Sequence, residues 1–152
     1  MNVYGTKAKE LFLQGYNCAQ AVVGAFAEDF NVDKDTLIML ASPFGGGMGR
    51  MREICGAFSG MLTVAGLKYG YADPKAHEEK TELYKFVQTL AAEFKAANGK
   101  DTLLCRELLN TAADTYVPEK RTEEYYKKRP CADIAATAAH IIGEYILGNK
   151  NI

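Results

Sequence analysis

Apolar residues recur three and four positions apart along nearly the whole chain, which is the period of an amphipathic helix. No segment of strand length shows the alternation of apolar and polar positions that a half-buried strand requires. The pattern predicts helices over about 3–13, 18–30, 33–41, 53–70, 74–98, 101–109 and 130–148. The two longest are expected to bury one face each: Leu83, Phe86, Val87, Leu90, Ala91 and Phe94 in the first, and Cys131, Ile134, Ala138, Ile141 and Tyr145 in the second. Residues 114–128 are polar and predict a loose helix or an exposed connector. We therefore expect an all-α fold, a single-domain helical bundle of about six to seven helices.

Turn and capping residues set the expected helix boundaries. Gly15 is typical of a position just past a helix end, and Asn17 can cap the helix that follows. Pro74 and Pro130 fit the first position of a helix, where a missing N–H costs nothing. Asp101 is expected to cap the 101–109 helix. No linker or low-complexity segment divides the chain, so residues 1–152 are expected to form one domain.

The most irregular stretch is residues 43–50, with the sequence PFGGGMGR, just before the most apolar helix of the chain. It does not fit a phosphate-binding P-loop, because no strand precedes it and no Lys-Ser or Lys-Thr pair follows. Consecutive glycines permit left-handed backbone and a close approach to a neighbour or ligand. The loop's N–H groups, with Arg50 and Arg52 nearby, could hold an anion such as a phosphate or a cluster. The candidate cofactor-binding residues are Gly45, Gly46, Gly47, Gly49 and Arg50. A tight turn between helices remains the alternative.

Two glycines, Gly56 and Gly60, lie within the apolar helix after this loop. A glycine inside a helix costs about 1 kcal/mol relative to alanine. Close packing of this helix against a neighbour is the simplest compensation, and a homodimer formed through the same small residues is a second possibility.

Four cysteines are spread along the chain, and each is expected in the opening turn of a helix: Cys18, Cys55, Cys105 and Cys131. The first turn of a helix carries unpaired N–H groups and a partial positive charge, which favour a thiolate. Cys55, near Arg50 and Arg52, and Cys131, after Pro130, are expected to have the lowest thiol pKa values. The alternative is that the cysteines simply pack in the core. Their spacing matches no CxxC, zinc-finger or ferredoxin pattern, so only the fold could bring them together.

Charge and composition narrow the possible partners. Eighteen basic and nineteen acidic residues give a net charge of −1, which disfavours nucleic-acid and anionic-membrane partners. The N-terminus has no signal-peptide pattern, so a cytoplasmic location is expected. In that compartment cysteines are more often reduced, metal-bound or redox-cycling than held in structural disulfides. His77 and His140 are expected at the surface, and neither is placed to pair with a cysteine.

The cysteine and glycine strings resemble those of the redox-active proteins named for the pattern C_GCAxxG_C_C. The matching segments are 15–21 (GYNCAQA), 44–49 (FGGGMG), 54–60 (ICGAFSG), 104–109 (LCRELL) and the Pro-Cys pair at 130–131. The central string reads Cys-Gly-Ala where the name-giving one reads Gly-Cys-Ala. The resemblance implies a mostly helical fold and a redox or metal-linked role for the four cysteines as a set.

Three functions are compatible with the sequence. The first is an electron-transfer site in which the four thiolates hold an iron–sulfur cluster or zinc, stabilised by the converging helix dipoles. The second is a thiol–disulfide redox protein in which two of the cysteines cycle, with Cys55 and Cys131 as the catalytic candidates. The third is a non-catalytic helical binding module with buried cysteines. In the first two, a redox partner protein is expected.

Overall fold

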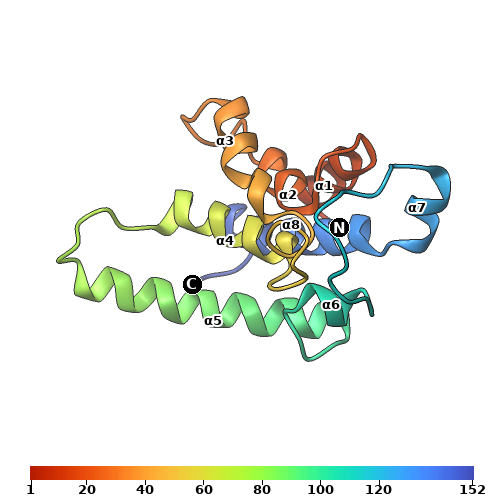
Figure 1. Cartoon of the computed structure of the whole chain (residues 1–152). Coiled ribbons are helices and arrows are strands. Elements are labelled where there is room, and N and C mark those ends of the chain that lie inside the picture. Colours follow the sequence, from red (N-terminus) through yellow and green to blue (C-terminus); the bar gives the residue numbers. More distant parts are fainter.

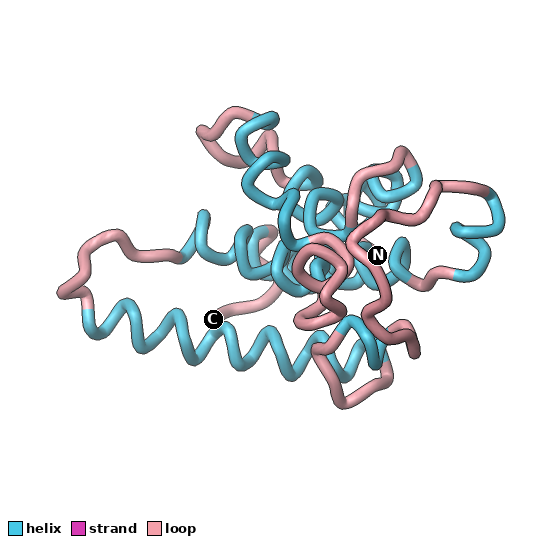
Figure 2. Tube along the Cα trace, in the orientation of Figure 1, coloured by secondary structure: helices cyan, strands magenta, loops and turns pink.

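The computed structural model describes residues 1–152 and is all-helical, which confirms the predicted fold class (Figure 1). It contains eight α-helices and one short 3₁₀ helix, with loops elsewhere (Figure 2). In chain order these are α1 (Val3–Leu13), α2 (Cys18–Ala25), α3 (Lys34–Ala41), η1 (Ser42–Phe44), α4 (Gly56–Tyr69), α5 (His77–Asn98), α6 (Cys105–Leu108), α7 (Glu123–Lys128) and α8 (Cys131–Ile146). None of these helices combines the length and the hydrophobicity that a membrane span requires.

The core forms where α1, α2 and α4 pack around α8, which runs through the middle of the molecule (Figure 1). The predicted inner face of α8 is buried at Ile134, Ala138, Ile141 and Tyr145. The long helix α5 lies along one side of this core and buries a stripe at Phe86, Leu90 and Phe94. Helical periodicity therefore predicted the buried faces of both helices correctly.

Several predicted helix boundaries were wrong by a few residues. Helix α5 begins at His77 instead of residue 74, because Asp73 accepts the Lys75 N–H and closes a separate turn. Helix α6 begins at Cys105 instead of 101, since Asp101 pairs with Lys95 at 3.1 Å and caps no helix. Helix α2 ends at Ala25, several residues before the predicted end.

The small residues of α4 face α2, as close helix packing requires. A Cβ atom at Gly60 would lie 2.8 Å from the Ala19 carbonyl oxygen and 3.0 Å from Val22 Cβ. The expectation of tight packing is thus confirmed. The chain's own α2 covers Gly60, and a homodimer of the protein stays a prediction.

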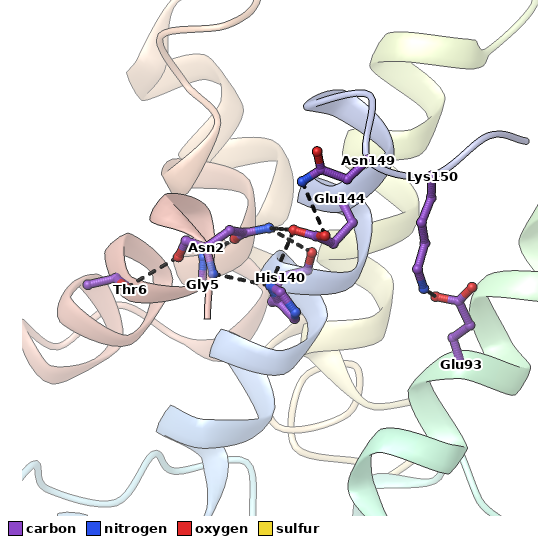
Figure 3. Close-up of polar contacts among 8 residues, drawn as sticks. All are labelled: Asn2, Gly5, Thr6, Glu93, His140, Glu144, Asn149 and Lys150. Carbon is purple, nitrogen blue, oxygen red and sulfur yellow. Dashed lines mark hydrogen bonds and ion pairs between the residues drawn. The ribbon is translucent and has the colours of Figure 1, made fainter.

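The start of the chain is anchored to α8 by Asn2 (Figure 3). Its side chain accepts the Gly5 N–H as the N-cap of α1, and its amide group donates to the His140 carbonyl oxygen and to Glu144. Its backbone N–H donates to Nδ1 of His140 at 3.2 Å. His140 is therefore half-buried at this junction, and His77 is exposed as predicted.

Candidate functional site

The glycine-rich loop folds into a left-handed turn. Five consecutive residues, 46–50, have φ angles between +57° and +69°, and Arg52 also has a positive φ of 58°. The turn is closed by backbone hydrogen bonds, including Gly49 N–H to Pro43 O at 2.8 Å and Glu53 N–H to Gly47 O at 3.0 Å. Left-handed backbone is unfavourable for residues with a Cβ, so Met48, Arg50 and Arg52 store strain here. Such strain is typical of functional sites.

This turn lies directly against two of the cysteines. A Cβ atom at Gly47 would lie 2.6 Å from Cys105 Cβ. On the other side, the Gly46 N–H interacts with the Cys18 sulfur, and a Cβ at Gly56 would lie 2.5 Å from that sulfur. The predicted close approach of the glycines is therefore confirmed, and the neighbours they approach are thiols.

A short antiparallel pairing brings Cys55 and Cys105 together from distant parts of the chain. Ile54 and Leu104 form an isolated β-bridge. On either side of it, the Cys55 N–H donates to Leu103 O at 2.8 Å and the Cys105 N–H donates to Glu53 O at 2.7 Å. The chain before α4 is thereby held against the chain before α6.

All four cysteines lie where a helix starts, as predicted. Cys18, Cys105 and Cys131 are the first residues of α2, α6 and α8, and Cys55 is the N-cap of α4. All four are free thiols; three are buried, and Cys131 is half-buried. Cys18 and Cys105 are both close enough to raise the pKa of Cys55 and of Cys131 by charge repulsion. The fold thus gathers the four thiols into one neighbourhood.

The expected low pKa values of Cys55 and Cys131 were wrong. Burial raises the pKa of Cys55 well above its ordinary value, and nearby Cys18 raises it further. Burial also raises the pKa of Cys131 to about 12, with Arg129 and Arg121 acting in the opposite direction. The pKa of Cys18 is raised by burial as well. Removal from water outweighs the helix N-terminus at these three sites.

The two arginines of the loop do not flank Cys55 as expected. Arg50 reaches across to residues 114–119, where it donates to the Val117 carbonyl and pairs with Asp114 and Glu119 at 3.5 Å. Arg52 is 4 % exposed, and its Nη1 lies 3.7 Å from Cys105 Sγ. Its Nε is buried without a hydrogen-bond partner.

A cavity of about 440 Å³ opens beside the left-handed turn. Cys18 and Cys131 both line it, as do the loop residues Gly45, Gly46, Gly49 and Arg50, whereas Cys55 and Cys105 do not. Sequence reasoning missed several lining residues from the polar stretch after α6 and from α7: Tyr116, Pro118, Glu119, Arg121, Tyr125 and Arg129. Residues 114–128 showed only a polar composition, which gave no signal that they border a cavity.

The four thiols do not form a metal's ligand set in the positions they have here. No group of three or more His, Cys, Asp or Glu side chains lies close enough together to hold a metal ion. The donor type suits zinc or an iron–sulfur cluster. A four-thiolate centre would nevertheless require these side chains to move.

Comparison with known proteins identifies one family. The model of the family described as "Putative redox-active protein (C_GCAxxG_C_C)" matches residues 16–145, a span that contains all four cysteines and the glycine-rich loop. No curated protein and no solved structure matches the chain.

Proposed function

Because the chain belongs to the C_GCAxxG_C_C family of redox-active proteins, we propose that it exchanges thiols and disulfides through Cys18 and Cys131. The observation that carries this proposal is that both cysteines line the same cavity. Cys131 is half-buried and Cys18 is buried, so we assign the first contact with a substrate to Cys131. We assign Cys55 no role in contacting the substrate, because this residue is buried and does not line the cavity.

The reaction is a two-electron exchange. The Cys131 thiolate attacks one sulfur of a substrate disulfide, the substrate S–S bond breaks, and one product thiol leaves with a proton. Cys18 then attacks Cys131 Sγ in the mixed disulfide and releases the second product thiol. The two protein thiols are oxidised to one disulfide, the substrate disulfide is reduced to two thiols, and two protons pass from the protein to the products.

The surroundings of Cys18 and Cys131 favour a thiol pair that reduces its substrate over one that oxidises it. Oxidising thiol pairs are those in which the reduced form is stabilised as a thiolate. Here burial raises the pKa of both Cys18 and Cys131, so the reduced form has no such stabilisation. The Gly46 N–H at Cys18 and the guanidinium groups of Arg129 and Arg121 near Cys131 favour the thiolate, but burial outweighs them.

Single Cys→Ser variants test the assignment. The fully reduced protein is mixed with excess small-molecule disulfide, and the adducts are read by intact mass. Cys18→Ser should stop at a mixed disulfide on Cys131, and Cys131→Ser should react slowest of the four. Cys55→Ser and Cys105→Ser are the matched controls and should still form an internal disulfide. Unimpaired reaction of Cys131→Ser would contradict the proposal.

A second candidate is the iron–sulfur or zinc centre held by Cys18, Cys55, Cys105 and Cys131. The mutual repulsion of these thiols as thiolates favours it, because a cation among them would remove that repulsion. Such a centre would supply one-electron transfer or a thiolate–zinc group. Iron, zinc and sulfide contents of protein purified without oxygen test it, and near-integral iron with sulfide would support it over the disulfide cycle.

A further inference from the structure

The charge lining the cavity is carried almost entirely by arginine. Four of the chain's five arginines line it: Arg50, Arg52, Arg121 and Arg129. None of the lysines does, and Glu119 is the one acidic residue in the lining. A guanidinium presents a planar fork of donors that matches carboxylate geometry, whereas a lysine is a point charge.

Two of these arginines lack an ionic partner. Glu119 pairs with both Arg50 and Arg129, and Asp114 also pairs with Arg50. Arg52 and Arg121 form no ion pair; the fifth arginine, Arg106, lies outside the cavity and pairs with Glu53 at 3.0 Å. The cavity therefore contains two guanidinium groups that no carboxylate of the protein neutralises.

Arg52 is the stronger indication of a ligand. It is 4 % exposed, its Nε has no partner, and its one side-chain hydrogen bond is a long contact with the Cys105 sulfur. A buried charge without a counter-charge is costly. An anion in the cavity would supply the missing partner.

Arg121 is held in a fixed position on the cavity wall. It donates to the Phe12 and Tyr16 carbonyl oxygens, at 3.4 and 3.1 Å. Its guanidinium lies over the Phe12 ring at 4.4 Å and over the Tyr125 ring at 4.8 Å. This pre-organisation lowers the entropic cost of binding an anion.

We propose that the cavity binds a small disulfide that carries carboxylate groups, with Arg52 and Arg121 as its carboxylate-binding residues. This inference rests on the proposed thiol–disulfide exchange, and it names the substrate class for that site. Two guanidinium groups without an ionic partner favour a ligand with at least two carboxylates. The thiols of Cys18 and Cys131 in the same cavity favour a ligand whose disulfide lies between those carboxylates. The volume, about 440 Å³, is that of a small-molecule site.

Two disulfides of different charge test the inference. Glutathione disulfide carries carboxylates, and 2-hydroxyethyl disulfide is neutral. The reduced protein is mixed with each, and the rate at which the Cys18–Cys131 disulfide forms is measured. We expect the wild-type protein to react at least about tenfold faster with glutathione disulfide, because the guanidinium groups bind its carboxylates.

The ratio of the two rates isolates anion binding from thiol reactivity. Loss of Arg121 also alters the reactivity of Cys131, but that change affects both disulfides alike. Arg121→Gln should therefore lower the ratio about fivefold or more, and Arg121→Lys should restore it only in part. Arg106→Gln, which removes the one arginine outside the cavity, should leave the ratio unchanged. Circular dichroism checks that each variant is folded.

The outcomes separate this inference from the function on which it rests. Equal rates with the two disulfides, with the Cys18–Cys131 bond still formed, would overturn the carboxylate site and keep thiol–disulfide exchange. If neither disulfide produced that bond, the proposed function and the disulfide substrate would both fail. Calorimetry with S-methylglutathione, which cannot exchange, then tests the anion site directly; binding that Arg121→Gln abolishes would support it, and no binding would overturn it.

Discussion

Single residues of the glycine-rich loop set the geometry of the thiols. Gly47 has a positive φ of 69°, and an added Cβ would meet Cys105 Cβ at 2.6 Å and the Glu53 backbone at 2.9 Å. A Cβ at Gly56 would likewise lie 2.5 Å from the Cys18 sulfur, and the Gly46 N–H lowers the pKa of the Cys18 thiol. The loop is thus a close-packed wall of the site as well as a connection between helices.

Gly47→Ala should destabilise the protein by about 2–4 kcal/mol, the combined cost of left-handed backbone and of overpacking against Cys105. Gly99→Ala is the matched control, since Gly99 has nearly the same φ, 66°, and open space around it. The control should lose only about 1 kcal/mol. Urea unfolding measures both, and equal losses would contradict the close contact with Cys105.

The raised pKa of Tyr145 leads us to expect a lower free energy of unfolding at high pH. Burial, together with its 2.6 Å hydrogen bond to Glu93, raises its pKa to about 12. The folded state therefore holds the phenolic proton more tightly than the unfolded chain, whose tyrosine pKa is about 10. This stabilisation is complete below pH 10 and is lost as the pH rises from 10 to 12.

The Tyr145→Phe variant has no phenolic proton, so its stability does not include this pH-dependent contribution. The stability gap between wild type and variant should therefore shrink between pH 10 and 12, by an amount on the order of 2 kcal/mol. Unfolding followed at several pH values measures the gap. A gap that stays constant over this range would show that the Tyr145 pKa is close to that of the unfolded chain.

At the scale of elements, sequence reasoning predicted the class of structure and the faces of the helices but not all of their ends. The stripes of α5 and α8 followed from spacing alone, because burial repeats with the helical period. The starts of α5 and α6 did not. Asp73 closes a separate turn over Pro74, which was expected to be the first residue of α5, and Asp101 pairs with Lys95 in place of the cap expected of it. Competing local hydrogen bonds decide such boundaries.

The N-terminal helix α1 is held to α8 through its cap residue, Asn2. Asn2 caps α1 and also bonds to His140 and Glu144 of α8, so Asn2→Ala should cost about 2 kcal/mol, the upper end for a helix cap. Asp33 caps α3 from an exposed position, and Asp33→Ala is expected to cost nearer 1 kcal/mol. Thermal unfolding of both variants would measure the difference. The reverse order would contradict the anchoring of α1 to α8.

In the whole molecule, the four cysteines and the cavity arginines come together, and this proximity could not be predicted from the sequence. The position of each cysteine at a helix start could be predicted from local signals, but their proximity depends on the Ile54–Leu104 bridge and on the packing of α2, α4 and α8. Arg121 and Arg129 lie far along the chain from Arg52, and nothing local indicates that they share a cavity with it. The raised thiol pKa values likewise arise from burial, which only the folded molecule reveals.

We propose that Cys18 and Cys131 form the redox pair. The most direct measurement is peptide mapping of the disulfide that forms when the reduced protein is equilibrated with increasing ratios of oxidised to reduced dithiothreitol. We expect a Cys18–Cys131 disulfide to appear first, with Cys55 and Cys105 still available for alkylation after unfolding. A first disulfide that contains Cys55 or Cys105, or no disulfide at any ratio, would contradict it.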